Sequence, residues 1–461
     1  MIVPLAAAVK HACLRTLIEG CVLTFVAIGM VQTWLLDGLV MPYQVAGSSM
    51  AGTLRGGHRD MVCGDCGYRF SCGTDLSPVA LRAVCPNCGY PGNDLESLPD
   101  RGGDYVLMDR TAFSVRPPRR WEIVAFRRAS QADQITVKRV VGLPGETIEI
   151  RHGDVYADGR LLRKNLVQQR ALAVLVHDAQ FQPRREPALP LRWRPERRDN
   201  GWTAVGGDFA HAAGKNGPLD WLEYHHGRES PVTDLCAYNP SQPRREEDVH
   251  PVSDLLVSFQ LVDLAGSGIF HIRMRDGHDD FQVRLDFGGS PPRYQVLRNG
   301  RPLDGGAGDV ATARGQRLLE VSLVDQQFLL ALDGQTLLAW PYERFDPPPT
   351  PPACPLALGA EGLEVTVGAL RVYRDVYYTD PAGSLGHRRS NRPVRLGAGQ
   401  YYVLGDNSPV SEDSRQWTTG GEVDAKLFVG KPLVAIAPAR LSLAGWGQFQ
   451  VPNPLGIRYI W

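Results

Sequence analysis

Two segments of the chain carry residue types that could act together in nucleophilic catalysis. Ser49 lies in a Gly- and Ser-rich stretch, residues 43–54, and Lys138 lies in an apolar, β-branched stretch, residues 136–150. Burial in such a strand would lower the pKa of Lys138, which would make its amine a usable general base for a serine hydroxyl. Taken singly, each segment also fits an ordinary structure, a solvated loop or a lysine that reaches the surface along its alkyl stem.

A third segment, residues 399–417, is an apolar strand that runs into a turn dense in hydroxyl, carboxylate and guanidinium groups. A solvated loop is the alternative for this segment alone. In this order, behind an apolar N-terminal run, the three segments resemble the bacterial type I signal peptidases. Their Ser/Lys dyad cleaves signal peptides from exported preproteins. The resemblance covers about residues 16–150 and 395–455.

The resemblance implies a role for each matching residue. Ser49 is expected to be the nucleophile and Lys138 the general base, with Ser411 hydrogen-bonded to the lysine. Asp413 and Arg415 are expected to form an ion pair that holds the site. The oxyanion hole and its support are expected from Gly47, Ser48, Asp406 and Asn407, chiefly through the backbone N–H of Ser49 with help from Ser48.

The chain departs from the family pattern at three places. Met50-Ala-Gly-Thr-Leu54 lacks the proline of the usual Met-x-Pro-Thr-Leu, Gly47 stands where some members have a hydroxyl residue, and Glu122 stands where Gly-Asp is frequent. None of these changes removes the dyad. The mechanism requires no metal or cofactor, and the expected substrates are extended peptides with small-x-small cleavage sites.

The N-terminus predicts a membrane anchor. Residues 20–36 contain no charge, which is close to the length needed to cross a bilayer. A cleaved signal peptide and a buried core helix are the alternatives. We expect a transmembrane helix over 16–36. Positive charges before it place residues 1–15 in the cytoplasm and the catalytic domain on the periplasmic side of the inner membrane.

Four cysteines form two CxxC pairs with the spacing of a zinc ribbon. Cys63 and Cys66 are separated from Cys85 and Cys88 by eighteen residues. This pattern predicts a closed tetrahedral site for a structural zinc ion, in an insert spanning residues 60–92. A pair of disulfides is the alternative, because the segment is expected outside the cytoplasm.

A larger insertion, residues 168–392, contains regularly spaced strand-like runs with Asp-Gly and Asn-Gly turns between them, which favours a β-sandwich. Its strand pattern resembles the concanavalin/laminin-G-like jelly rolls. Carbohydrate or an envelope protein are the partners this resemblance implies, and a spacer role is the alternative.

The whole chain is therefore expected to be mainly β. An N-terminal transmembrane helix would precede an antiparallel catalytic domain divided into residues 40–167 and 393–461. The 461 residues carry 50 basic and 50 acidic side chains, which gives no reason to expect nucleic-acid binding. The expected function is a signal peptidase whose partners are preprotein signal peptides, the lipid bilayer and the secretion translocon. An inactive envelope-anchored protein that displays the sandwich is the alternative.

Overall fold

The computed structural model describes most of the chain. The described residues are 5–32, 38, 40–75, 80–128, 131–185, 189–197, 199–212, 218–227, 230–240, 249–310, 316–344, 348–379, 393–417, 421–436, 440–442, 450–452 and 457–460.

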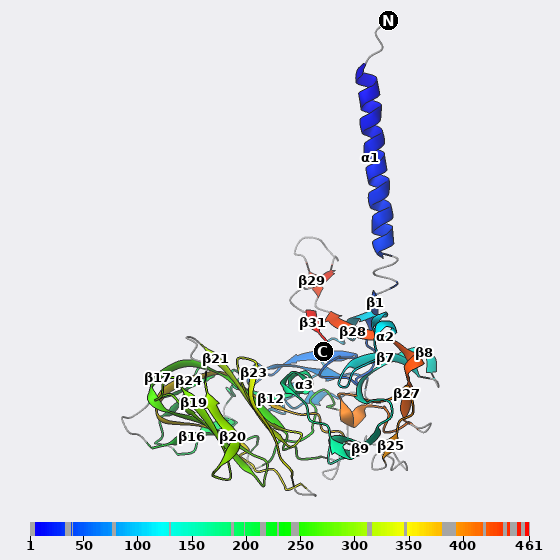
Figure 1. The fold of residues 1–461 in the computed structure, drawn as a ribbon. Helices are drawn as coiled ribbons and strands as arrows, with labels where there is room; N and C mark the ends of the chain where they lie inside the picture. Colours follow the sequence, from blue (N-terminus) through cyan, green and yellow to red (C-terminus); the bar gives the residue numbers. More distant parts are fainter. Residues whose placement is uncertain are drawn as a thin grey trace.

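The N-terminal helix α1, Leu5–Met30, extends away from the rest of the molecule (Figure 1). It begins before the predicted membrane segment, and residues 33–36 of that segment lie outside the described residues. The apolar side chains along its C-terminal half are exposed, with Leu23 at 68% and Phe25 at 79%. A search of the described helices finds none with the length and apolar character of a membrane span.

Two antiparallel sheets make up the catalytic part. The larger runs in the order β1-β6-β28-β7-β8-β26-β27, with β31 added to β28. Its strands are β1 Val40–Gln44, β6 Tyr105–Asp109, β7 Ile123–Arg128, β8 Gln131–Gly142, β26 Gln400–Leu404, β27 Glu422–Asp424, β28 Phe428–Ile436 and β31 Ile457–Tyr459. The smaller has the order β11-β10-β9-β25, from β9 Thr147–Arg151, β10 Asp154–Ala157, β11 Arg160–Leu161 and β25 Val394–Arg395. Both sheets thus join strands from before and after the large insertion.

The pairing of β8 with its two neighbours positions the predicted catalytic residues. Val124 of β7 pairs with Lys138, and Leu404 at the end of β26 pairs with Arg139. The turn that begins at Gly405 therefore starts beside the lysine. Because β7 is apolar throughout residues 123–126 and these side chains are fully buried, this centre of the sheet is fixed by core packing.

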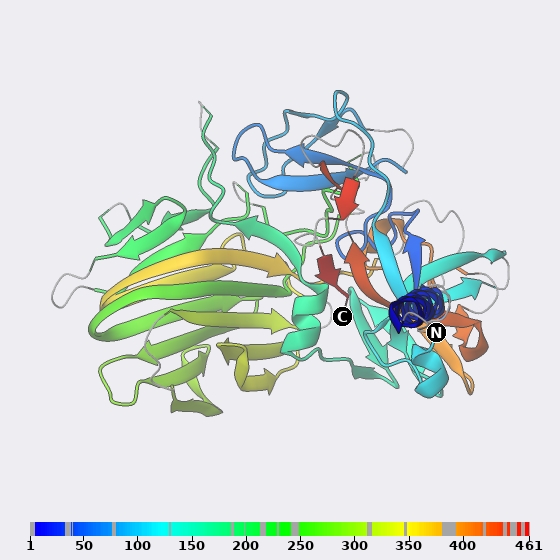
Figure 2. The same cartoon turned by 90° about the horizontal axis from the view of Figure 1, so that it is seen from above.

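The insertion forms a thirteen-stranded sheet system that lies beside the catalytic part (Figures 1 and 2). Its strands are β12 Val174–Asp178, β13 Trp193–Pro195, β14 Trp202–Val205, β15 Asp208–His211, β16 Asp220–Tyr224, β17 Leu255–Arg275, β18 Asp280–Asp286, β19 Arg293–Arg298, β20 Arg301–Asp309, β21 Arg317–Val324, β22 Gln327–Leu332, β23 Gln335–Pro341 and β24 Leu356–Arg374. The long strands β17 and β24 pair along most of their length. Their inward side chains enclose the largest hydrophobic core of the molecule.

One sequence expectation for the insertion is corrected. The runs 255–264 and 269–275 read as two strands, but they form the single strand β17. The register between β17 and β24 shifts on both sides of Gly266, whose φ of 101° is a conformation open to glycine. The polar and Gly-rich stretch that looked like a loop is therefore an irregular part of a continuous strand.

The remaining elements are short. Strands β2 His58–Val62, β3 Arg69–Gly73, β4 Arg82–Ala83 and β5 Asn93–Asp94 form a small lobe around the four cysteines, hereafter the cysteine lobe (residues 58–94). In Figure 2 this lobe lies at the junction between the insertion and the catalytic sheets. The other elements are the helices α2 Ala112–Val115 and α3 Leu166–Leu172, the 3-10 turns η3 Ser408–Val410 and η4 Ala425–Leu427, and the strands β29 Arg440–Ser442 and β30 Gln450–Pro452.

Candidate active site

The loop that carries Ser49 is anchored by its apolar neighbours. Met50 and Leu54 are buried in a core with Val106 and Ile123, and the Leu54 N–H donates to the Met50 carbonyl at 2.8 Å. Among the described residues, the only hydrogen bond of Ser49 is the one that its carbonyl accepts from the Asn407 N–H at 3.1 Å. Its hydroxyl and its N–H are therefore free to meet a substrate.

Lys138 is buried, and its Nζ donates a hydrogen bond of 3.1 Å to Ser411 Oγ. Burial lowers the pKa of Lys138 to about 8, while the nearby carboxylate of Asp413 acts in the opposite direction. About a tenth of this amine is neutral at pH 7 and about half at pH 8, far more than for an ordinary lysine, so it can accept a proton.

The turn after β26 is held by a buried ion pair. Arg415 donates to both carboxylate oxygens of Asp413, at 2.9 and 2.7 Å, and the Gly405 N–H also donates to Asp413 at 3.0 Å. The same guanidinium donates to the Ser408 hydroxyl at 2.8 Å. These bonds fix the path of the chain from Gly405 to Arg415, and with it the place of Ser411.

Gly405 lies where the turn packs tightly against the nucleophile loop. A Cβ placed on this glycine would lie 2.4 Å from the Ser49 carbonyl oxygen and 2.1 Å from Ser411 Oγ. Both distances are shorter than real Cβ atoms tolerate, so only glycine allows this approach. The glycine therefore lets the carbonyl of the predicted nucleophile lie against the residue that contacts Lys138.

A second buried ion pair, which the sequence analysis did not predict, connects the same segments. Arg139 donates to both oxygens of Asp406, at 2.8 and 2.6 Å, and the Thr53 hydroxyl donates to Asp406 at 2.5 Å. Gly52 stands at the position of the family's proline and has a φ of 97°, which proline cannot adopt. In this chain the hydrogen bond from Thr53 to Asp406 holds the loop, whereas in the family pattern the ring of the proline would stiffen it.

The predicted oxyanion residues take different positions. The Ser48 N–H donates to Asp75 at 2.8 Å and the Ser48 carbonyl accepts from Asn407 Nδ2 at 3.0 Å, so the backbone of Ser48 is already engaged. Gly47 is exposed, and its backbone lies against Gly56. A Cβ placed on Gly56 would lie 2.7 Å from the carbonyl carbon and oxygen of Gly47. The free N–H of Ser49 is the donor this loop offers.

Among the residues of the insertion that reach this site is Asn239, which no motif marks in the sequence. Asn239 is buried, and its amide exchanges two hydrogen bonds with the amide of Asn407, at 2.8 and 2.9 Å. Its neighbour Tyr238 accepts a hydrogen bond of 2.8 Å from the Gly73 N–H of the cysteine lobe through its carbonyl. The segment around Asn239 thus lies between the cysteine lobe and the catalytic turn.

Residues 92–190 and 371–436 match the family model described as signal peptidase, peptidase S26. The resemblance to the type I signal peptidases is confirmed. The match covers less than half of the chain. It includes Lys138 and the turn from Gly405 to Arg415, whereas Ser49 lies before its first residue.

Signal peptidases are also found among individual relatives. Signal peptidase I of Leptolyngbya laminosa is 27% identical over 106 residues, which are 22% of this chain and 49% of that protein. Signal peptidase I of Pseudomonas aeruginosa is 31% identical over 78 residues, 14% of this chain and 28% of that protein. The chain thus spans half or less of the length of these relatives. At the family level they support a peptidase.

Two solved structures resemble part of the chain only distantly. The carbohydrate binding module CBM66 from Bacillus subtilis has a TM-score of 0.24 and 9% identity, over 40% of this chain and 95% of that one. The potassium-bound Emp46p carbohydrate recognition domain has a TM-score of 0.27 and 11% identity, over 40% of this chain and 89% of that one. Likenesses this weak carry no argument about the fold or ligand of this chain.

The four predicted metal ligands form a separate cluster in the cysteine lobe. Their sulfur atoms all lie within 4.8 Å of one another, with Cys63 Sγ 3.7 Å from Cys88 Sγ and Cys66 Sγ 3.8 Å from Cys85 Sγ. No two of them are joined by a disulfide. Four thiolates at about 2.3 Å from a central zinc ion would lie about 3.8 Å apart, so the arrangement fits a tetrahedral site.

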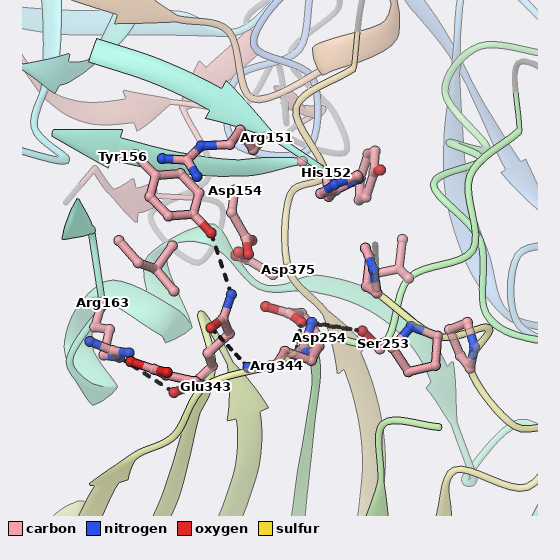
Figure 3. A pocket seen from close by; sticks show the side chains of 18 of the residues that line it. Arg151, His152, Asp154, Tyr156, Arg163, Ser253, Asp254, Glu343, Arg344 and Asp375 are labelled. Atoms are coloured by element: carbon pink, nitrogen blue, oxygen red, sulfur yellow. Dashed lines mark hydrogen bonds and ion pairs between the residues drawn. The ribbon is translucent and has the colours of Figure 1, made fainter. Parts of the chain in front are cut away.

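A polar cavity of about 670 Å³ marks the junction between the smaller catalytic sheet and the insertion (Figure 3). Asp254 and Asp375 line it, together with Asp154 from β10. Lys164 pairs with Asp375 at 3.0 Å and with Asp325 at 2.6 Å. Burial and the charges of Asp254 and Asp325 raise the pKa of Asp154 well above its ordinary value. These groups join the two parts of the chain.

Proposed function

We propose that the chain is a membrane-bound serine endopeptidase that cleaves N-terminal signal peptides from exported preproteins after small-x-small sites. The observation that carries the proposal is the convergence of three segments. Buried Lys138 contacts Ser411, and the carbonyl of Ser49 is bonded to Asn407 in the same turn. Since the family match does not reach Ser49, its role rests on this contact and on its free hydroxyl.

The proposed reaction uses residues of this chain alone. Neutral Lys138 takes the hydroxyl proton of Ser49, and Ser49 Oγ attacks the scissile carbonyl. The N–H of Ser49 donates to the oxyanion that forms. Lys138 then protonates the leaving amine and activates the water that hydrolyses the acyl-enzyme. Ser411 holds the lysine in place throughout.

The test is cleavage of a model preprotein with an Ala-x-Ala site. Ser49→Ala and Lys138→Met should each lower kcat/KM by at least about 10²-fold to 10⁴-fold, since each removes a group that acts in the reaction. Ser114→Ala and Lys426→Met are matched changes at exposed positions and should cut like the native chain. Full activity of folded Ser49→Ala or Lys138→Met protein would exclude the Ser/Lys mechanism.

We further propose that α1 anchors the protein in a bilayer with its N-terminus in the cytoplasm. The support is the row of exposed apolar side chains on α1, among them Leu17, Leu23 and Phe25, which soluble proteins rarely leave in contact with water. The full chain should stay in the membrane fraction after alkaline extraction. The double change Leu23→Arg and Phe25→Arg should release it, because arginine inserts poorly at mid-bilayer depth. Release of the unchanged chain would contradict the anchor.

A structural zinc ion in the cysteine lobe completes the proposal. It would be held by Cys63, Cys66, Cys85 and Cys88, whose sulfur spacing fits it. Such a closed site leaves no position for a substrate, so its role is to hold the lobe. The catalytic steps do not involve it.

A further inference from the structure

A second cavity, of about 870 Å³, begins at the nucleophile loop and ends inside the insertion. At one end it is lined by residues 51–53, which follow Ser49 directly. Tyr68 and Phe70 of the cysteine lobe line a further part, and residues 174–176, 232–233 and 235–240 of the insertion line another. We name it the junction cavity. Most of its wall thus comes from outside the two catalytic sheets.

The junction cavity is strongly cationic. Among the described residues that line it, the only carboxylate is that of Asp406, which Arg139 already neutralises. Six arginines also line it: Arg55, Arg82, Arg170, Arg192, Arg374 and Arg458. Three of these have carboxylate partners, because Arg55 and Arg458 pair with Asp104, and Arg170 pairs with Glu320. Among the described residues no carboxylate pairs with Arg82 or Arg192, so the positive charge of these two arginines is not balanced by an ion pair.

Arg192 is the buried arginine without an acidic partner. Its side chain is only 9% exposed. Nη1 donates to the Val176 carbonyl at 3.3 Å and to His226 Nδ1 at 3.0 Å. Among the described residues no carboxylate pairs with it, and its Nε and Nη2 groups donate no hydrogen bond. These two groups can therefore donate to an anion in the cavity, and a largely buried guanidinium is stabilised by such a partner.

The neighbours of Arg192 leave its charge intact. His226 accepts from Arg192, so its Nδ1 carries no proton, and burial together with the charge of Arg192 lowers the pKa of His226 to about 3. Arg374, 7% exposed, lines the same cavity and donates to the backbone carbonyls of Asp234 and Leu235 at 3.2 and 3.3 Å. Arg192 thus lies at the cavity beside a second guanidinium group and a neutral imidazole.

We propose that the junction cavity binds an acidic side chain of the polypeptide substrate, with Arg192 donating to its carboxylate. The inference rests on the proposed peptidase function and adds a specificity site to it. A polypeptide is favoured over a free anion because the cavity is continuous with the loop of Ser49. Its aromatic wall, Tyr68 and Phe70, offers contact area that a small anion does not use.

The test uses a set of peptides that share one small-x-small cleavage site. Each peptide carries a single Asp at a different position before or after the cleaved bond, and each has a matched peptide with Asn at that position. The native chain should favour Asp by about tenfold in kcat/KM at one or two adjacent positions, mainly through KM, as expected for a charge-assisted hydrogen bond. Arg192→Gln should bring the Asp/Asn ratio to about one. Arg192→Lys should retain part of the preference.

Arg197→Gln is the matched control, because Arg197 is exposed, pairs with Asp220 and does not line the cavity. It should keep the native ratio. A ratio near one at every position in the native chain, or a preference that persists in folded Arg192→Gln protein, would overturn the inference.

A binding measurement separates this inference from the proteolytic function. The Ser49→Ala chain should bind a fluorescent Asp peptide about tenfold more tightly than its Asn partner, whether or not the native chain cuts either one. Inorganic phosphate provides the second arm. If phosphate raises the melting temperature only when Arg192 is present, while the two peptides bind equally, the cavity takes free anions and the polypeptide proposal is wrong.

Discussion

Asn239 and Asn407 hydrogen-bond each other reciprocally through their side-chain amides, at 2.8 and 2.9 Å, although one belongs to the insertion and the other to the catalytic turn. The second N–H of the Asn407 amide donates to the Ser48 carbonyl. The orientation of this amide, and with it the position of the peptide bond before Ser49, therefore depends on a residue of the insertion. The insertion is therefore a structural part of the proposed catalytic site.

Asn239→Ala should lower kcat by up to about thirtyfold with little change in KM, since it removes two neutral hydrogen bonds that contribute about 1 kcal/mol each. Asn165→Ala provides the control. Asn165 caps helix α3 through Gln168 and makes no contact with the catalytic loops, so its loss should reduce stability alone. The positioning role would be excluded if both variants lost similar stability and kept the native kcat.

The pH dependence of cleavage should follow Lys138. Because the amine must be neutral and its pKa is about 8, kcat/KM should fall about tenfold for each pH unit below 8 and level off above it. The charge of Asp413 raises this pKa, so Asp413→Asn should move the midpoint to lower pH. The measurement is a pH–rate profile on a peptide without titratable groups. A midpoint that moves upward in Asp413→Asn would refute the assignment.

Lys138 should lower the free energy of unfolding of the protein at neutral pH. Below about pH 8 the lysine is charged in both the folded and the unfolded chain, so the full penalty for burying the charge is present. It disappears as the pH rises through the folded value of about 8 to the ordinary value of 10.5. Lys138→Met should therefore raise the free energy of unfolding by about 2–3 kcal/mol at pH 7 and by much less at pH 10. Urea unfolding at both pH values measures the difference, with Lys426→Met as the reference. A variant less stable than the native chain at pH 7 would contradict the expectation.

The cysteine lobe should carry about one zinc ion per chain by atomic absorption. Cys66→Ser should abolish that metal and lower the melting temperature, because closed zinc sites contribute directly to folding. Cys72→Ser is the matched control, since Cys72 is equally buried but lies outside the cluster and donates to the Ala237 carbonyl. Metal-free protein with an unchanged melting temperature would argue against a structural ion.

The parts of the site that could be predicted from sequence lie within short contiguous patterns. Lys138 stands in one strand, and Ser411, Asp413 and Arg415 stand within five residues of one turn, so local order fixes their relative positions. Asn239 is 168 residues from its partner Asn407, and Arg139 is 267 residues from Asp406. Such pairings depend on how the insertion and the strands pack against each other. The pattern of apolar and polar residues along the chain does not predict that packing.

The same limit applies to the fold. Asn299-Gly300 and Asp333-Gly334 were recognisable as hairpin turns, and all four residues adopt the positive φ that such turns require. The continuity of β17 through Gly266 was not recognisable, because a strand that tolerates shifts in register looks like a loop when its partner strand is unknown.

The first strand of the insertion begins at Val174 and its last strand ends at Arg374, and these two residues are direct partners in the antiparallel pair of β12 and β24. Because the two ends of the insertion lie next to each other, the strands outside it can keep their positions when the insertion is present. A domain of this kind can therefore be gained in a single genetic event. Loss of the insertion would no longer be neutral for the rest of the chain. Excision at the same two points would leave the remaining strands connected in their present order, but it would remove Asn239 from beside Asn407. The two parts of the chain are therefore expected to be kept or lost together in evolution.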